Sequence, residues 1–175
     1  MLLGLPAFTL IHVVLSLFGI LTGLVVAGGF LAGIRHERWT ALFLVTTLLT
    51  SLTGFGFPFA GVLPSHVVGA LSLLVLAIAC TALYARRLAG HWREVFVVSS
   101  VLALYLNVFV LVAQLLQKTP VLAALAPTPD APVAAVTQLL FLACFVRLGW
   151  GAVKGFRAGR AATGLPVAGV ATPSA

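Results

Sequence analysis

Five long apolar runs, separated by short polar or proline-rich segments, limit most strongly what this chain can fold into. A helix needs about 20 apolar residues to cross the hydrocarbon core of a bilayer. Backbone groups in lipid must be satisfied internally, and the period-2 alternation of barrel strands is absent. The sequence therefore predicts an all-α, polytopic transmembrane helical bundle. Its five predicted spans cover residues 8–34, 40–61, 64–85, 95–117 and 133–151.

The composition agrees with lipid as the main solvent. Apolar residues make up 62% of the 175 residues and charged residues 7%, with a mean hydropathy of +1.20. Soluble domains contain about 45–50% apolar and about 25% charged residues. One bundle is expected over residues 1–157. Residues 158–175 are rich in Ala, Gly, Pro, Thr and Ser, and they are predicted to form a short disordered cytoplasmic tail.

The basic residues predict the orientation, because cytoplasmic loops carry the excess of Lys and Arg. With the amino terminus outside and the carboxyl terminus inside (N-out/C-in), Lys118 is the one basic residue outside. The nine others lie on the cytoplasmic side: Arg35, Arg38, Arg86, Arg87, Arg93, Arg147, Lys154, Arg157 and Arg160. Tryptophan prefers the headgroup level, and Trp39, Trp92 and Trp150 all fall at cytoplasmic ends of predicted spans.

The charges and cysteines exclude several other interpretations. The net charge is +7, and the basic residues that produce it lie between apolar runs. This placement indicates contact with anionic headgroups and not with nucleic acid. No basic residue precedes Arg35, and the first run exceeds the roughly 7–15 residues of a signal-peptide core, so we expect a retained helix. Cys80 and Cys144 lie inside apolar runs and are expected to behave as small hydrophobic residues.

Small residues along the first run predict a surface for helix packing. Ser16, Gly19 and Gly23 share one helical stripe with His12, at intervals of three and four residues, and Gly29 and Gly33 form a second pair four residues apart. Pairs of small residues four apart let two helix backbones approach closely. The predicted packing residues are Ser16, Gly19, Gly23, Gly29 and Gly33.

Polar residues inside apolar runs are the best available indicators of a site, because polar groups are costly in hydrocarbon. Five of them are candidates for ligand binding: His12, His66, Asn107, Gln114 and Gln138. In the predicted topology Asn107 lies near the midplane, whereas the other four share the outer leaflet. They predict either a polar pocket open to the outside or hydrogen bonds between helices. The two histidines could also simply face interfacial water.

The sequence contains no motif that fixes a reaction. The runs hold no HExxH, no GxSxG and no carboxylate inside a span, so neither a catalytic residue nor a metal site is predicted. We therefore interpret the chain as an accessory or small-ligand-binding subunit. Its expected partners are the lipid bilayer and either other membrane subunits or further copies of itself. The alternative is a haem b-binding electron-transfer protein with His12 and His66 as axial ligands. A small carrier or channel is less favoured, because no charged residue lies mid-membrane.

Several stretches, which together cover most of the chain, carry a resemblance: Ile11–Leu17, Pro64–Gly69, Tyr105–Gln114, Lys118–Pro120 and Leu125–Thr128. They resemble a bacterial family of small polytopic membrane proteins to which no activity is assigned. The resemblance implies a multi-pass protein of the bacterial inner (cytoplasmic) membrane. Relatives carry an acidic Gln-Ser-Glu-Pro-Pro before the last span, where this chain reads Pro129-Asp130-Ala131-Pro132.

Overall fold

The computed structural model describes residues 5–57, 64–126, 128 and 131–162. These residues form six α-helices and one π-helical turn, and none of them forms a strand. The predicted all-α fold class is confirmed. The elements are α1 (Leu5–Leu31), α2 (Glu37–Gly54), α3 (Pro64–Cys80), the π-helical turn η1 (Thr81–Ala85), α4 (Trp92–Lys118), α5 (Pro120–Leu125) and α6 (Pro132–Ala162).

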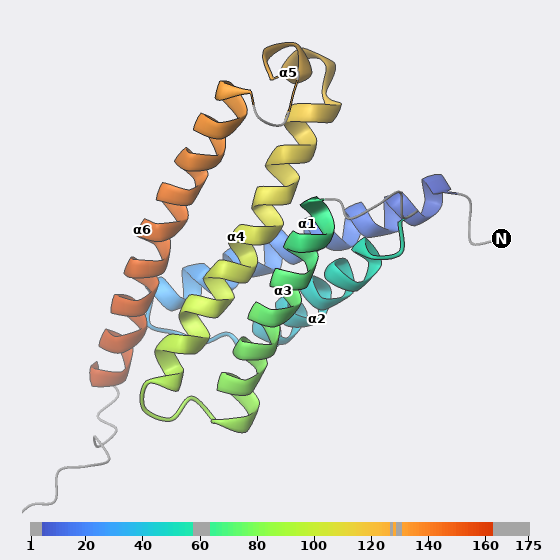
Figure 1. Cartoon of the computed structure of the whole chain (residues 1–175). Coiled ribbons are helices and arrows are strands. Elements are labelled where there is room, and N and C mark those ends of the chain that lie inside the picture. Colours follow the sequence, from blue (N-terminus) through green and yellow to red (C-terminus); the bar gives the residue numbers. More distant parts are fainter. Residues whose placement is uncertain (1–4, 58–63, 127, 129–130, 163–175) are drawn as a thin grey trace, which may run out of the picture.

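Helix α4 lies at the centre of the bundle, in contact with α1, α3, α5 and α6. Figure 1 shows α3, α4 and α6 side by side, with the hairpin of α1 and α2 lying obliquely to them. Three buried rings join the central helices, because Phe30 of α1 packs edge-on against Phe96 of α4 and Phe156 of α6. The ring centroids lie 5.6 and 5.1 Å apart, within the range that favours edge-to-face pairs.

Four of the described helices are long and apolar enough to cross a membrane. Their candidate spans are Ala7–Leu31, His66–Ala85, Trp92–Lys118 and Pro132–Gly159. All four correspond to predicted spans. By length and composition, these helices place the chain among membrane-spanning proteins.

Helix α2 corresponds to the remaining predicted span but does not reach the same apolar character. Residues 58–61 of that predicted span lie outside the described residues. The helix runs antiparallel to α1, because its residue Phe43 lies beside Gly23 and its residue Thr53 beside His12. It therefore extends along much of the length of α1, and its crossing of the membrane stays a prediction.

The two faces of α2 have opposite chemistry. The buried face carries most of the hydroxyl groups of the helix beside Phe43 and Leu44, and the exposed face is apolar: Leu42, Val45, Leu48, Leu49 and Leu52. A surface helix of a water-soluble protein shows the reverse pattern, with apolar residues inward and polar residues outward. The inversion is typical of a helix whose outer face contacts lipid.

Helix α6 is longer than the span predicted for this part of the chain. Helix α6 continues to Ala162, past the expected end at residue 151 and five residues into the predicted tail. The extra turns are stabilised because Gly155 and Gly159 pack directly against the end of α1. The rest of the tail, from residue 163, lies outside the described residues, as does Asp130.

Candidate functional site

His12 is half-buried and bonded to α2. Its Nδ1 lies 2.8 Å from the Thr53 hydroxyl, and its ring meets Phe57 edge-on at 5.2 Å. The Thr53 hydroxyl donates its one proton to a backbone carbonyl of its own helix, that of Leu49 at 2.8 Å. The same hydroxyl is hydrogen-bonded to His12 Nδ1, so the Thr53 side chain contacts both helices. His12 thus joins α1 to α2.

His66, the second predicted haem ligand, is buried at the start of α3. Its ring lies 5.8 Å from the ring of Phe55, centroid to centroid. The two histidines therefore pack against different phenylalanines of one short segment, residues 55–57. Haem ligation by this pair stays a prediction.

The three amide candidates have different surroundings. Asn107 is only 6% exposed, and its Nδ2 donates to the Thr47 hydroxyl oxygen at 3.3 Å, joining α4 to α2. Gln138 Nε2 donates to the Phe109 carbonyl at 3.1 Å, joining α6 to α4. Gln114 is exposed. Since the bonds of His12, Asn107 and Gln138 link three different helix pairs, they act as connections between helices and do not surround one cavity.

The hydroxyl-rich interior of α2 was not among the predicted candidates. Its buried members are Thr40, Thr46, Thr47, Thr50 and Ser51. The spacing of Thr40, Thr47 and Ser51 at i, i+7 and i+11 is one helical face, and that spacing was the available signal. Thr46 and Ser51 donate to carbonyls of their own helix, whereas the buried hydroxyl oxygens of Thr40 and Thr50 have no protein partner.

The predicted packing glycines contact two different parts of the structure. Gly19 and Gly23 face α2 and α4: an added Cβ would lie 3.3 Å from Thr46 Oγ1 at Gly19 and 2.7 Å from Leu104 Cδ1 at Gly23. Gly29 instead lies against His36 of the following loop. Ser16, in the same stripe, is half-buried.

The end of α1 packs against a series of glycines in α6 that was not among the predicted packing residues. Gly33 has φ +75°, the left-handed conformation that ends many helices, and it lies against Gly155 and Gly159. An added Cβ would overlap the backbone carbonyls of Phe30 and Leu31 at Gly155, and the backbone of Gly33 at Gly159. The available signal was the four-residue spacing of Gly151, Gly155 and Gly159.

An apolar cleft of about 350 Å³ opens between α4, α5 and α6. Its floor is formed by the buried Val112 and Leu116, and most of its other lining side chains are exposed. The polar member of the lining, Thr137, donates its hydroxyl proton to the Val133 carbonyl at 2.8 Å. The complete lining is Val112, Leu115, Leu116, Leu122, Leu125, Val133, Thr137 and Phe141.

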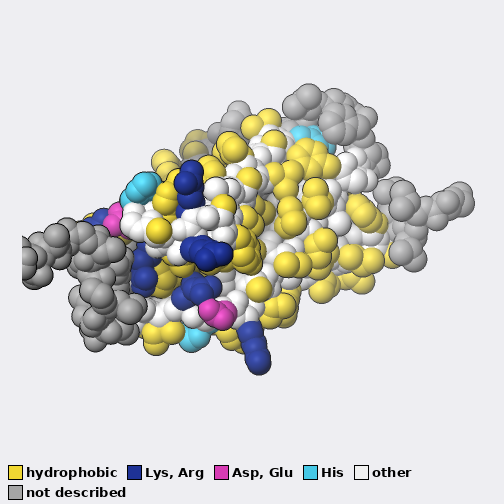
Figure 2. Space-filling view, turned by 90° about the horizontal axis from the view of Figure 1, so that it is seen from below, with side chains coloured by type: hydrophobic (Ala, Val, Ile, Leu, Met, Phe, Trp, Pro, Cys, Tyr) yellow, Lys and Arg dark blue, Asp and Glu magenta, His cyan; other side chains and the backbone are white. Residues whose placement is uncertain are grey.

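The opposite end of the bundle is basic. Figure 2 shows Lys and Arg side chains gathered toward one end, while hydrophobic side chains cover much of the remaining surface. Both glutamates of the chain are ion-paired there: Glu37 with Arg35 at 2.5 Å, and Glu94 with Arg157 at 2.6 Å. These pairs leave the described residues of this end with a positive excess.

No protein-family model matches the chain, and no match was found among curated proteins or among solved structures. The class of protein is therefore defined by the fold, an all-α bundle with membrane-spanning helices. The predicted bacterial family and the predicted ligands stay predictions.

Proposed function

We propose that this protein is a multi-pass subunit of the bacterial inner membrane that binds a bilayer lipid. One acyl chain of this lipid lies in the cleft between α4, α5 and α6. The observation that carries the proposal is the cleft itself, whose volume of about 350 Å³ falls in the range of ligand pockets. The proposal gives a definite ligand to the small-ligand-binding role expected from the sequence.

The chemistry of the cleft favours a hydrocarbon chain over a polar solute. Seven of its eight lining residues are aliphatic or aromatic, and the eighth, Thr137, uses its hydroxyl proton within its own helix. A polar ligand would lose its hydration there without gaining matching hydrogen bonds, which is unfavourable. An acyl chain gains dispersion contacts and has no polar group to satisfy.

The position of the cleft favours a chain that comes from the bilayer. The α4 and α6 residues of its lining, among them Val112 and Phe141, lie within the candidate spans Trp92–Lys118 and Pro132–Gly159. Leu115 and Val133 are 48% and 45% exposed, so the rim is open to the surroundings of the helices. In a membrane those surroundings are lipid chains, and one of them can enter from the side.

The orientation belongs to the same proposal. The basic end faces the cytoplasm, because Lys and Arg are retained on that side. The cleft, at the other ends of α4 and α6, then lies in the outer leaflet. The amino terminus lies outside and the carboxyl terminus inside, with α2 as the fifth crossing helix.

A matched pair of valines in α6 tests the proposal. Val133 lines the cleft, whereas Val136, one turn further along, is 56% exposed and does not line it. In detergent, Val133→Phe should weaken binding of the fluorescent fatty acid cis-parinaric acid about tenfold, because overpacking a filled site costs about 1–3 kcal/mol. Val136→Phe should leave the dissociation constant unchanged. Equal constants for the wild type and Val133→Phe, or equal losses in both variants, would contradict chain binding in this cleft.

A further inference from the structure

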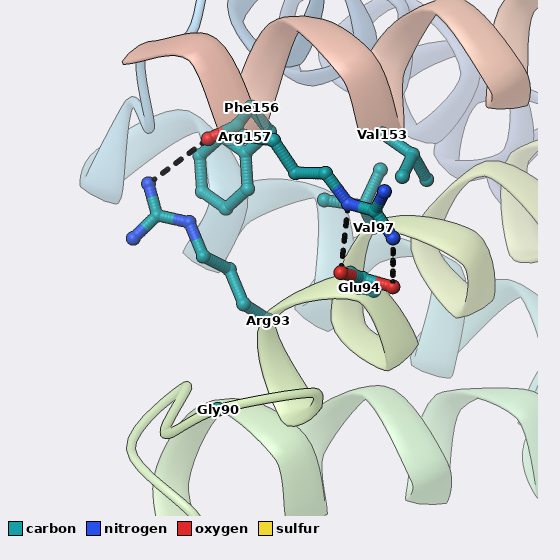
Figure 3. Close-up of a pocket in the computed structure, with 7 residues that line it drawn as sticks. All are labelled: Gly90, Arg93, Glu94, Val97, Val153, Phe156 and Arg157. Atoms are coloured by element: carbon teal, nitrogen blue, oxygen red, sulfur yellow. Dashed lines mark hydrogen bonds and ion pairs between the residues drawn. The ribbon is translucent and has the colours of Figure 1, made fainter. Parts of the chain in front are cut away.

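A second cavity, of about 110 Å³, lies at the basic end between the first turns of α4 and the last turns of α6 (Figure 3). Its side-chain lining is half apolar and half charged: Val97, Val153, Phe156, Arg93, Glu94 and Arg157. A purely ionic surface patch would not include a buried phenylalanine and two valines. The mixed lining fits a molecule with an anionic head and an apolar body.

Both arginines of this cavity are held in place by neighbours. The Arg93 guanidinium carbon lies 4.0 Å from the centroid of the Phe156 ring, and its Nη2 donates to the Phe156 carbonyl at 3.3 Å. Arg157 donates from Nε and Nη2 to the two oxygens of Glu94, at 2.7 and 2.6 Å. Figure 3 shows these contacts around the cavity. Guanidinium groups fixed in this way lose little freedom on binding, and their planar fork suits phosphate oxygens.

Two tryptophans on the two helices that form the cavity, Trp92 of α4 and Trp150 of α6, indicate its depth in the membrane. The guanidinium carbon of Arg86 lies 5.0 Å from the ring centroid of Trp92, the first residue of α4. The Lys154 ammonium nitrogen lies 3.6 Å from the ring centroid of Trp150 in α6. Tryptophan rings prefer the headgroup level of a bilayer. The charged part of the cavity therefore lies where lipid phosphates lie.

We infer that this cavity binds the phosphate of an anionic phospholipid. Arg93 and Arg157 contact the phosphate oxygens, and Phe156 with the two valines contacts the first carbons of the chains. A free phosphate ion would gain nothing from the apolar part of the lining. This site is separate from the cleft between α4, α5 and α6, and its existence does not depend on that cleft.

The ion pair between Glu94 and Arg157 should oppose the binding of a lipid phosphate. The carboxylate competes with a lipid phosphate for the same guanidinium and repels the phosphate charge. Glu94→Gln should therefore strengthen lipid binding, whereas loss of a cation at the cavity should weaken it. If Arg93 and Glu94 only stabilised the fold, substituting either of them would change lipid binding in the same direction.

Native mass spectrometry of the whole protein in a non-ionic detergent tests the inference. Phosphatidylglycerol is titrated against phosphatidylcholine with identical chains, so that binding of a chain elsewhere contributes equally to both. Arg93→Gln should lower the preference for phosphatidylglycerol about tenfold, and Glu94→Gln should raise it about threefold. Arg38→Gln, which removes the same charge from an exposed position outside the cavity, should leave it nearly unchanged.

Several outcomes would overturn the inference. An equal loss in Arg38→Gln and Arg93→Gln would show a general surface charge effect. Displacement of phosphatidylglycerol by inorganic phosphate at constant ionic strength would assign the site to a soluble anion. A loss of preference in Glu94→Gln, with an unchanged unfolding temperature, would show that Glu94 does not compete with the ligand.

Discussion

At the scale of single residues, close contacts between helices depend on glycine and on a few hydrogen-bonded polar groups. Gly155 allows the backbone of α6 to approach the Phe30 and Leu31 carbonyls of α1, and no larger residue fits there. Asn107 was recognisable from sequence because an amide inside an apolar run is costly and needs a partner. Its partner Thr47 was not, because a threonine can satisfy its hydroxyl within its own helix.

Gly155→Ala should destabilise the protein, because the new Cβ would overlap the backbone oxygens of α1. We expect a loss of about 2 kcal/mol in the free energy of unfolding, the usual size of an overpacking effect. Gly149→Ala in the same helix is the control, since its Cβ would meet only Val101 Cγ1 at an ordinary 3.6 Å. Thermal unfolding in detergent measures both. A fall in Gly149→Ala as large as in Gly155→Ala would contradict the contact.

The hydrogen bond from Asn107 to Thr47 should be measurable by a double-mutant cycle. Asn107→Leu removes the donor and Thr47→Val removes the acceptor of this bond. The double variant removes both. We expect a coupling energy of about 0.6 kcal/mol, the average for polar pairs between membrane helices, and at most about 1.7 kcal/mol. Denaturation in mixed detergent gives the four free energies. Strict additivity would mean that the bond does not hold α4 to α2.

At the scale of elements, hydropathy predicted the helices well because the length of an apolar run directly reflects the thickness of the bilayer. It gives no sign of the additional turns of α6, because these depend on a packed glycine contact with the end of α1. It also placed α2 among the apolar spans, although its hydroxyl face is buried and only its exposed face is consistently apolar. The cleft between α4, α5 and α6 could not be predicted, because the sequence does not distinguish leucines and valines that line a cleft from those that face lipid.

The exposed face of α2 should tolerate only apolar residues if it contacts lipid. Leu48 is 42% exposed and lies near the middle of that face. Leu48→Arg should reduce the amount of folded protein in membranes strongly, because a central arginine costs about 2.5–3.5 kcal/mol on insertion scales. Leu48→Phe should be tolerated. Quantifying detergent-extracted, monodisperse protein checks this, and equal yields of Leu48→Arg and wild type would mean that the face is in water.

At the scale of the whole molecule, the bundle has two chemically different ends joined by apolar helices. One end carries the arginines and the small cavity around Arg93, and the other holds the apolar cleft and the hydrogen bond of His12 to Thr53. In the proposed orientation, lipid heads are bound in the inner leaflet and a lipid chain in the outer one. The proposed orientation requires that α1 to α4 and α6 cross the bilayer with the basic end inside.

Topology mapping tests this arrangement of the helices in the membrane. Alkaline phosphatase, which is active only outside the cytoplasm, is inserted within residues 58–63, inserted within residues 126–131, or fused after Ala162. We expect activity at the first two positions and none at the third. An inactive insertion at residues 58–63 would show that α2 does not cross, and an active fusion after Ala162 would contradict the cytoplasmic placement of the basic end.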